Sequence, residues 1–293
     1  MIPAPTLVVD YSSSSLHEQQ FLQHRLPTSF QQWNGSDGNP SALFYRLADD
    51  YLIRFPEIAD FRVSARGEDI ACLPSTGSGE RWQAVYQQQV LPLLPSLTGD
   101  PVYHGAAIAF KDVAIAFLGP SGFGKSTLAA AFAARGYPFL GDDCLQLSEA
   151  ADGEVHVQPH ADHIRLWQDS IDALAPSQAI TAHARGSTKP HLAASAALPH
   201  CNRALPLRRV YVLGDGLVDT ATVTPLSAAS TIMGWTRNAF VLDIKSPTVL
   251  QRSFSAATRL AQHVPGRHLD YPRSYDALDD VLACVLADVA TPA

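Results

Sequence analysis

The sequence has few charged residues and few cysteines. Only 17% of its 293 residues are charged, the formal net charge is −7, and no stretch is rich in lysine and arginine. Binding to a nucleic-acid backbone needs such a basic surface, so the composition argues against nucleic acid as a partner. The four cysteines are scattered without metal-ligand spacing, which is typical of isolated thiols in a reducing compartment. No run approaches the roughly 18 apolar residues of a membrane span, and the N-terminus lacks the pattern of a signal peptide. We therefore expect a cytoplasmic protein with no membrane partner.

A glycine-rich loop is the most informative feature that is present. The run Gly119-Pro120-Ser121-Gly122-Phe123-Gly124-Lys125-Ser126 fits the phosphate-binding pattern of a glycine, four residues, a second glycine, a lysine and a hydroxyl residue. Glycines let backbone N–H groups face an anion, and the helix that follows adds its unpaired N–H groups and the positive end of its dipole. Lys125 is expected to reach the β- and γ-phosphates of ATP, and the Ser126 hydroxyl to hold Mg²⁺. The residues predicted to bind the nucleotide are Gly119, Ser121, Gly122, Phe123, Gly124, Lys125, Ser126 and Thr127.

The segments on either side of this loop have the pattern that a phosphate-binding loop requires. Residues 112–118 form a short apolar run, which is typical of a buried strand. Residues 127–135 are rich in alanine and leucine, which favour a helix, and Gly136 supplies a stop. Because a strand, a glycine-rich loop and a helix follow in this order, a chance glycine turn is the weaker interpretation.

An acidic pair follows one helix after the loop. The apolar segment Tyr137–Leu140 predicts a second strand that runs into Gly141-Asp142-Asp143. If the two strands belong to one parallel sheet, their carboxyl ends meet at the same edge, which brings Asp142 and Asp143 near the γ-phosphate. One carboxylate can then orient or deprotonate an attacking hydroxyl, and the other can hold magnesium. The alternative is a helix cap or a solvated turn, which Asp pairs often form.

Together these residues resemble a known family. Lys125-Ser126-Thr127, Arg135-Gly136 and Leu140-Gly141-Asp142-Asp143 are similar to the catalytic domain of HPr kinase/phosphorylase, a bacterial serine kinase. ATP-dependent phosphoenolpyruvate carboxykinase has a similar loop and Asp pair and shares that core fold. The similarity is good from about His104 to Leu147 and looser towards both ends. It implies an α/β fold with a P-loop nucleotide-binding core of the HPr kinase / phosphoenolpyruvate carboxykinase type, a β-rich N-terminal region and a helical C-terminal segment.

The resemblance also implies roles for individual residues. Asp142 matches the family's catalytic base and Asp143 matches its neighbour, while His104 lies in a segment similar to the family's histidine-glycine segment near the active site. His163-Ile164-Arg165 falls where the family has Glu-Ile-Arg, so Arg165 is retained. The catalytic residues implied in this way are Asp142, Lys125, His104 and Arg165, and the metal ligands are Ser126 and Asp143.

Two positions depart from the family pattern. His163 replaces the metal-linked glutamate, and Thr127 replaces the glutamate that commonly follows the loop serine. Both changes alter the charge around the transferred group, so we expect a kinase without the reverse phosphorolysis reaction of HPr kinases. His163 itself is either a metal or substrate contact or an ordinary surface or core histidine.

The resemblance implies a serine kinase that uses ATP and Mg²⁺ and acts on a peptide or a small protein. The chain also resembles shorter HPr-kinase-like proteins, several of which belong to lasso peptide gene clusters and phosphorylate a serine at the C-terminal end of a precursor peptide. A homo-oligomer is implied as well, since HPr kinases form hexamers. In the irregular stretch Thr181–Asn202, Arg185 and Lys189 are either cations that close over the phosphates or solvated surface residues.

Two rival functions stay open. One is a metabolite kinase of the same fold, and the other is a nucleotide-dependent regulator that keeps the loop for binding alone. The acidic pair disfavours the regulator, since a protein that only binds nucleotide has less need of a base. Neither the Leu-Ser-Gly-Gly-Gln signature of transporter ATPases nor the Asn-Lys-x-Asp motif of GTPases occurs in the sequence.

The chain changes character near residue 100. Residues 1–100 hold short aromatic and β-branched runs separated by turn residues, which predict a small antiparallel sheet, and a helix is expected over Arg81–Leu94. Residues 101–293 hold the kinase-like core, with helices expected over Ala228–Asn238, Pro247–His263 and Ser274–Val289. The sequence suggests no role for the N-terminal region.

Overall fold

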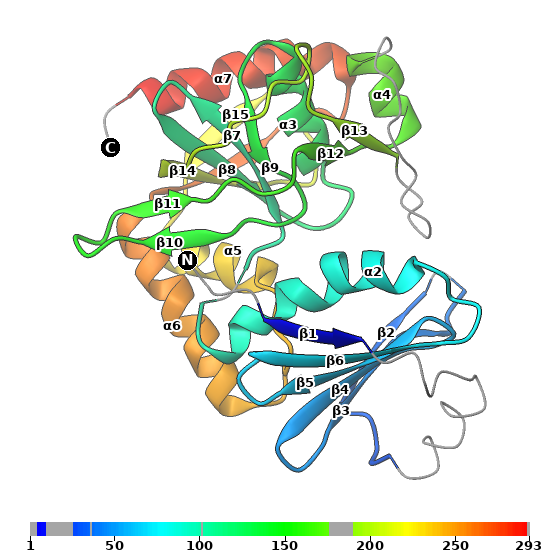
Figure 1. Cartoon of the computed structure of the whole chain (residues 1–293). Coiled ribbons are helices and arrows are strands. Elements are labelled where there is room, and N and C mark those ends of the chain that lie inside the picture. Colours follow the sequence, from blue (N-terminus) through cyan, green and yellow to red (C-terminus); the bar gives the residue numbers. More distant parts are fainter. Residues whose placement is uncertain (1–4, 10–25, 36, 101, 176–189, 292–293) are drawn as a thin grey trace. The chain divides into compact units, whose positions relative to one another are not determined.

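The protein is a mixed α/β chain that divides into two compact units. The computed structural model describes residues 5–9, 26–35, 37–100, 102–175 and 190–291 (Figure 1). One unit comprises Met1–Pro101 with Val241–Ser253, and the other comprises Val102–Phe240 with Phe254–Ala293. The segment Val241–Ser253 therefore groups with the N-terminal unit, whereas the sequence suggested a single change near residue 100.

The first unit is built on a sheet with the strand order β1-β6-β5-β4-β3-β2. Its strands are β1 (Thr6–Val9), β2 (Gln31–Asn34), β3 (Pro40–Arg46), β4 (Asp50–Phe55), β5 (Ala59–Ser64) and β6 (Asp69–Pro74). All neighbours are antiparallel except β1 and β6, which are parallel. The predicted antiparallel sheet is thus present, with one parallel pair added. The sequence analysis did not identify β2, a four-residue edge strand. Trp33 of β2 packs against Phe44 of β3, with ring centroids 4.9 Å apart.

The helix expected over Arg81–Leu94 is not one regular helix. It comprises α2 (Arg81–Val85), a π-helical turn (Tyr86–Val90) and a 3₁₀ segment (Leu91–Leu97). Pro92 and Pro95 explain the irregular end, because proline lacks the N–H that an α-helix needs in its interior.

The second unit is built on a sheet of eight strands. The order is β10-β11-β14-β8-β7-β9, with β16 beside β14 and β15 beside β16. Its strands are β7 (Gly105–Phe110), β8 (Val113–Leu118), β9 (Phe139–Gly141), β10 (Leu147–Glu149), β11 (Val155–Val157), β14 (Leu205–Leu213), β15 (Thr222–Pro225) and β16 (Gly266–Asp270). A separate pair joins β12 (His163–Arg165) to β13 (His191–Ala193). Neither β13 nor β15 was expected from the sequence.

Helices cover both faces of this sheet, and the alternation of residues along β8 shows how. The helices are α3 (Lys125–Ala134), α4 (Gln168–Leu174), α5 (Ala228–Asn238), α6 (Pro247–His263) and α7 (Leu278–Ala290), the last preceded by a 3₁₀ turn at Tyr275–Ala277. Ile115 and Phe117 of β8 belong to a core with α3, α4 and α7. Ala116 and Leu118 point the other way, into a core with α5 and α6. The central strand is therefore buried on both faces, as its continuous apolar sequence predicted.

β9, the strand that leads into Asp142 and Asp143, runs in the expected direction but is not the neighbour of β8. β9 pairs antiparallel with β7, and β7 pairs antiparallel with β8, so β9 and β8 point the same way without being neighbours. The expected parallel sheet is wrong at this point, because the hairpin of β7 and β8 places an antiparallel strand between them. The carboxyl ends of β8 and β9 nevertheless lie at the same edge of the sheet, as expected.

Two smaller observations concern the helices. α5 and α6 have the predicted bounds, and on α6 Leu250 and Phe254 are 43% and 51% exposed whereas Ala257 and Leu260 are buried. Among the helices that the structure describes, none is long and apolar enough to span a membrane.

Candidate functional site

The glycine-rich loop runs from the end of β8 to the start of α3. Gly122 and Gly124 have φ angles of 85° and 88°, a left-handed conformation that side chains rarely adopt. A Cβ at Gly124 would also lie 2.6 Å from the Tyr271 hydroxyl oxygen, so the loop needs glycine there for space as well. The spacing of glycines that identified the loop is therefore required by its backbone.

Lys125 lies across this loop at the first turn of α3. Its side chain is buried, and Nζ donates hydrogen bonds to the carbonyl oxygens of Gly119 at 2.7 Å and Pro120 at 3.0 Å. A buried ammonium group needs such partners, and its charge makes the surrounding loop a favourable place for an anion.

Asp142 is the buried member of the acidic pair that follows β9. Its Oδ2 accepts a hydrogen bond from the backbone N–H of Arg165 at 3.0 Å, whereas its buried Oδ1 has no hydrogen-bond partner among the described residues. Burial, followed by the negative charge of Asp143, raises the pKa of Asp142 to about 7, although the nearby Arg165 N–H and Ser126 hydroxyl lower it. A carboxyl group with a pKa near neutrality, beside the loop serine, can accept or give up a proton under ordinary conditions.

Asp143 is the more accessible member of the pair, and the side chains of Arg165 and His104 lie near its carboxylate. Its Oδ2 lies 2.8 Å from Nη1 of Arg165, and its Oδ1 lies 3.6 Å from Nε2 of His104. Its φ angle is 63°, a strained value for a residue with a side chain. Strain of this kind is held by the surrounding structure, and it aims the Asp143 carboxylate at Arg165 and His104.

His104 is held by the end of α5. Its backbone N–H donates to the carbonyl oxygen of Asn238 at 2.6 Å, and its ring packs against Phe240 with centroids 5.9 Å apart. The Asn238 side chain in turn contacts the glycine-rich loop, because its Oδ1 accepts from the Gly119 N–H at 3.2 Å and its Nδ2 donates to the Gly234 carbonyl. Asn238 therefore ties the loop, α5 and His104 together.

These residues surround a cavity of about 90 Å³, which we call the Lys125 cavity. The residues that line it are His104, Ser121, Gly122, Gly124, Lys125, Ser126, Thr127, Asp143, Arg165, Leu166 and Trp167. The structure thus brings together most of the residues that the sequence predicted, with Asp142 adjoining the cavity through Arg165 and Ser126. Gly119 and Phe123, also predicted to bind nucleotide, line a different pocket.

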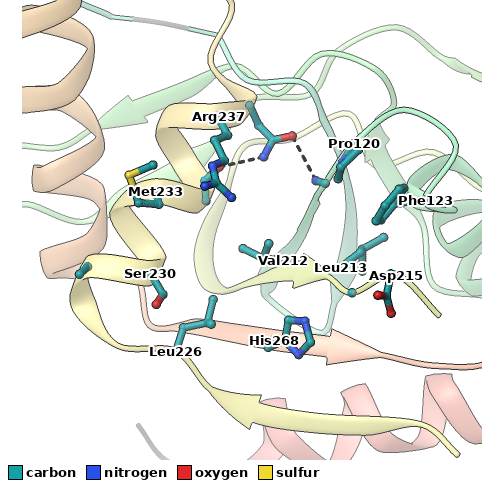
Figure 2. Close-up of a pocket in the computed structure, with 15 residues that line it drawn as sticks. Pro120, Phe123, Val212, Leu213, Asp215, Leu226, Ser230, Met233, Arg237 and His268 are labelled. Carbon is teal, nitrogen blue, oxygen red and sulfur yellow. Dashed lines mark hydrogen bonds between the residues drawn. The ribbon is translucent and has the colours of Figure 1, made fainter. Parts of the chain in front are cut away.

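That second pocket has a volume of about 690 Å³ and lies beside α5 (Figure 2). We call it the α5 pocket. Its loop residues are Gly119, Pro120 and Phe123, and its apolar lining includes Val212, Leu213, Leu226 and Met233. No part of the sequence analysis anticipated it, because its walls come from segments that are far apart in the chain.

Other predicted residues have clear positions. Thr127 shares a hydrogen bond of 3.2 Å with the Ser170 hydroxyl of α4. His163 stacks on His191, with ring centroids 4.6 Å apart, and does not line the Lys125 cavity. Arg185 and Lys189 lie outside the described residues.

Sequence reasoning missed two residues of this region. Trp167 is 50% exposed and lines the Lys125 cavity. Asn238 was seen only as the last residue of a helix. The position of Trp167 two residues after Arg165 is visible in the sequence, but its exposure is not, and nothing in the sequence marks Asn238.

The residues present fit a magnesium–nucleotide complex. Ser126 and Asp143, which both line the Lys125 cavity, offer oxygen atoms, which are the ligands that Mg²⁺ prefers. Within the described ranges, no group of three or more His, Cys, Asp or Glu side chains is placed to hold a metal ion by itself. Mg²⁺ does not need such a group, since it is commonly held by one or two carboxylates together with substrate phosphates.

Comparisons of the chain with known proteins differ between sequence and structure. No protein-family model matches the chain, and no curated protein matches it. Among solved structures, the chain is similar to the Hpr(Ser) kinase/phosphatase from Coxiella burnetii, with 10% sequence identity and a TM-score of 0.33, over 64% of this chain and 95% of that chain.

Proposed function

We propose that the chain is an ATP-dependent kinase that transfers the γ-phosphoryl group to a serine hydroxyl of a peptide or small protein. One observation carries this proposal: Asp142, a buried carboxyl group whose Oδ1 has no hydrogen-bond partner among the described residues, lies beside Ser126 of the glycine-rich loop. A loop that only bound nucleotide would have no need for a base at that position. Phosphoryl transfer needs both an anion cradle and an acceptor-side base.

The loop residues would bind and orient ATP. The start of α3 offers unpaired backbone N–H groups to the phosphates, and Lys125 exchanges its contacts with Gly119 and Pro120 for phosphate oxygens. Ser126 and Asp143 would hold Mg²⁺, which when bound neutralises charge that develops on the phosphate oxygens. Most of the catalysis would then come from positioning and charge neutralisation.

Asp142 would serve the acceptor. Its Oδ1 accepts the hydrogen bond of the serine hydroxyl and then takes the proton, as the bond from serine Oγ to the γ-phosphorus forms and the bond from that phosphorus to the β–γ bridging oxygen breaks. ADP leaves, and the carboxyl group returns its proton to solvent. The Arg165 N–H on Oδ2 fixes the orientation of Asp142 during this transfer.

Arg165 and His104 would act next to the transferred group. Arg165 pairs with Asp143 and lines the cavity, so its guanidinium brings positive charge beside the phosphates. His104 lines the same cavity and lies 3.6 Å from Asp143. Both side chains hold Asp143 in place.

The acceptor is the least constrained part of the proposal. The sequence resemblance supports a serine in a peptide, with the C-terminal serine of a lasso peptide precursor as the first candidate. Because His163 stacks on His191 and does not line the Lys125 cavity, we infer that it does not substitute for the family's metal-linked glutamate. We therefore expect transfer in the forward direction only.

The test is mass spectrometry of serine peptides incubated with the protein, ATP and Mg²⁺. Candidate precursor peptides ending in serine would be compared with matched peptides in which that serine is alanine. A gain of one phosphate on the serine, absent with the Asp142→Asn variant, supports the proposal. Transfer only to small hydroxyl metabolites would support the metabolite kinase instead, and ATP binding without any transfer would support the regulator. Efficient release of pyrophosphate from phosphopeptide and inorganic phosphate would contradict the one-way expectation.

A further inference from the structure

The α5 pocket belongs to the second unit, and the proposed transfer reaction does not use it. Its volume of about 690 Å³ is in the range of pockets that bind small ligands or single side chains with their backbone. Its apolar lining comes from Val212 and Leu213 of β14 and from Leu226 and Met233, which are labelled in Figure 2. Met233 is 42% exposed there, so an apolar group in the pocket would cover surface that now faces water.

The polar groups of the pocket indicate the charge of its occupant. Arg237 stands on α5 at the rim, and within the described part of the chain no carboxylate lies within ion-pair distance of it. Figure 2 shows Asp215 across the pocket, where it is exposed and accepts the backbone N–H of Leu217. A guanidinium without a carboxylate partner at the edge of an apolar floor favours a ligand that combines an apolar group with an anion.

The α5 pocket lies beside the first residues of the glycine-rich loop. It is lined by Gly119 and Pro120, the first residues of the loop, whereas Ser126 and Thr127 at the start of α3 line the Lys125 cavity. Its wall residue Asn238 also holds the backbone of His104, which lies 3.6 Å from Asp143. A ligand in the α5 pocket therefore lies next to the residues that hold the transfer site.

We propose that the α5 pocket binds the acceptor next to its phosphorylated hydroxyl, taking one apolar side chain on its floor and pairing a carboxylate of the acceptor with Arg237. The proposal rests on the kinase function for its acceptor, but the pocket's preference for an apolar carboxylate is a binding property that is measured without phosphoryl transfer. It would make this pocket the part of the protein that selects among hydroxyl substrates.

The test uses Met233, because the sequence contains only two methionines, Met1 and Met233. Protein labelled with ¹³C at the methionine methyl groups gives a reporter inside the pocket, assigned with Met233→Leu. The probes are N-acetyl-leucine and its uncharged analogue N-acetyl-leucinamide. Adenosine is added as a competitor, to test whether the pocket binds a nucleoside instead. We expect N-acetyl-leucine to shift the Met233 signal saturably, with a Kd at least about fivefold lower than that of the amide.

Arg237→Gln is expected to remove this preference, while Arg259→Gln, at another partly exposed arginine of the same unit, leaves it unchanged. Arg237 also lies in the last turn of α5, where a cation stabilises the helix, so Arg237→Gln can change the stability of the protein without any effect on the ligand. The proposal is therefore tested by the ligand preference of the variant and not by its stability. The proposal is overturned if N-acetyl-leucine fails to shift Met233, if the amide binds equally well, or if Arg237→Gln keeps the preference. Saturable binding of adenosine that displaces N-acetyl-leucine would overturn it too, because the pocket would then belong to the nucleoside. Absence of phosphopeptide in the transfer assay would count against the kinase function and leave this result standing.

Discussion

The two cavities beside the glycine-rich loop are built in opposite ways. The Lys125 cavity is small and lined by charged and polar side chains, whereas the α5 pocket is several times larger and mostly apolar on its floor. Different residues of one loop line each of them, and Asn238 contacts the loop and holds His104. The difference shows that one loop can contribute to two kinds of surface. Where its backbone meets the N-terminus of α3 it suits an anion, and where its first residues meet β14 and α5 it suits an apolar group.

The largest effect is expected from a change in the Lys125 cavity. Lys125→Ala removes the cation that faces the phosphates and the contacts that close the loop on Gly119 and Pro120. Phosphoryl transfer should fall by about 10³-fold or more, and ATP affinity should fall with it. Calorimetric titration with a non-hydrolysable ATP analogue and a radiolabelled transfer assay check both parts.

Lys245→Ala, at an exposed lysine of the other unit, is the matched control and should leave both quantities unchanged. Normal ATP affinity in Lys125→Ala would show that the Lys125 cavity does not bind the phosphates.

A smaller effect on both cavities is expected at Asn238. Asn238→Ala leaves the Gly119 N–H without its acceptor and removes the bond to the Gly234 carbonyl, which should lower the free energy of unfolding by about 1–3 kcal/mol. Because the loop loses its anchor, ATP affinity and the Met233 shift should both change, with transfer down roughly tenfold. Arg237→Gln is the contrasting variant, since it should leave ATP affinity intact. Equal behaviour of the two variants would mean that Asn238 does not couple the cavities.

The smallest expected effect is a shift in stability with pH. The pKa of Asp142 is raised to about 7 in the folded protein, whereas an unfolded aspartate ionises near pH 4. Between these values the folded carboxyl group keeps a proton that the unfolded chain has lost, so stability falls as the pH rises, with the full loss above pH 7. Asp142→Asn should therefore melt several degrees above the wild type at pH 8 without nucleotide or metal, and the gap should shrink at pH 5.

Thermal denaturation of both proteins at the two pH values checks this, with Asp215→Asn as the control at an exposed carboxylate. A gap of the same size at pH 5 and pH 8 would show that burial of the charge is not its cause.

Local features of the site could be predicted from the sequence, and its assembly only in part. The loop glycines, Lys125 and the acidic pair follow a spacing that backbone geometry and phosphate chemistry impose, so they are visible in the chain alone. The edge shared by β8 and β9 was inferred for the wrong reason, because an antiparallel strand between them leaves no mark in the sequence of either.

The α5 pocket and the role of Asn238 depend on packing between distant segments. Asn238 makes bonds to Gly119 and His104, which are more than a hundred residues away, and an asparagine at a helix end has no distinctive pattern. Irregular helix geometry over residues 81–97 was missed because the apolar periodicity continues through the two prolines that break it.

The central claim is that Asp142 acts on the acceptor and not on the nucleotide, and one measurement tests it most directly. Asp142→Asn keeps the shape of the side chain and removes its capacity to take a proton. Single-turnover transfer from radiolabelled ATP to a serine peptide would be measured beside calorimetric ATP affinity, on the same preparations of variant and wild type. The account predicts an ATP affinity within about threefold of wild type and transfer reduced by roughly 10²–10⁴-fold. Transfer at nearly the wild-type rate would contradict it and remove Asp142 from the mechanism.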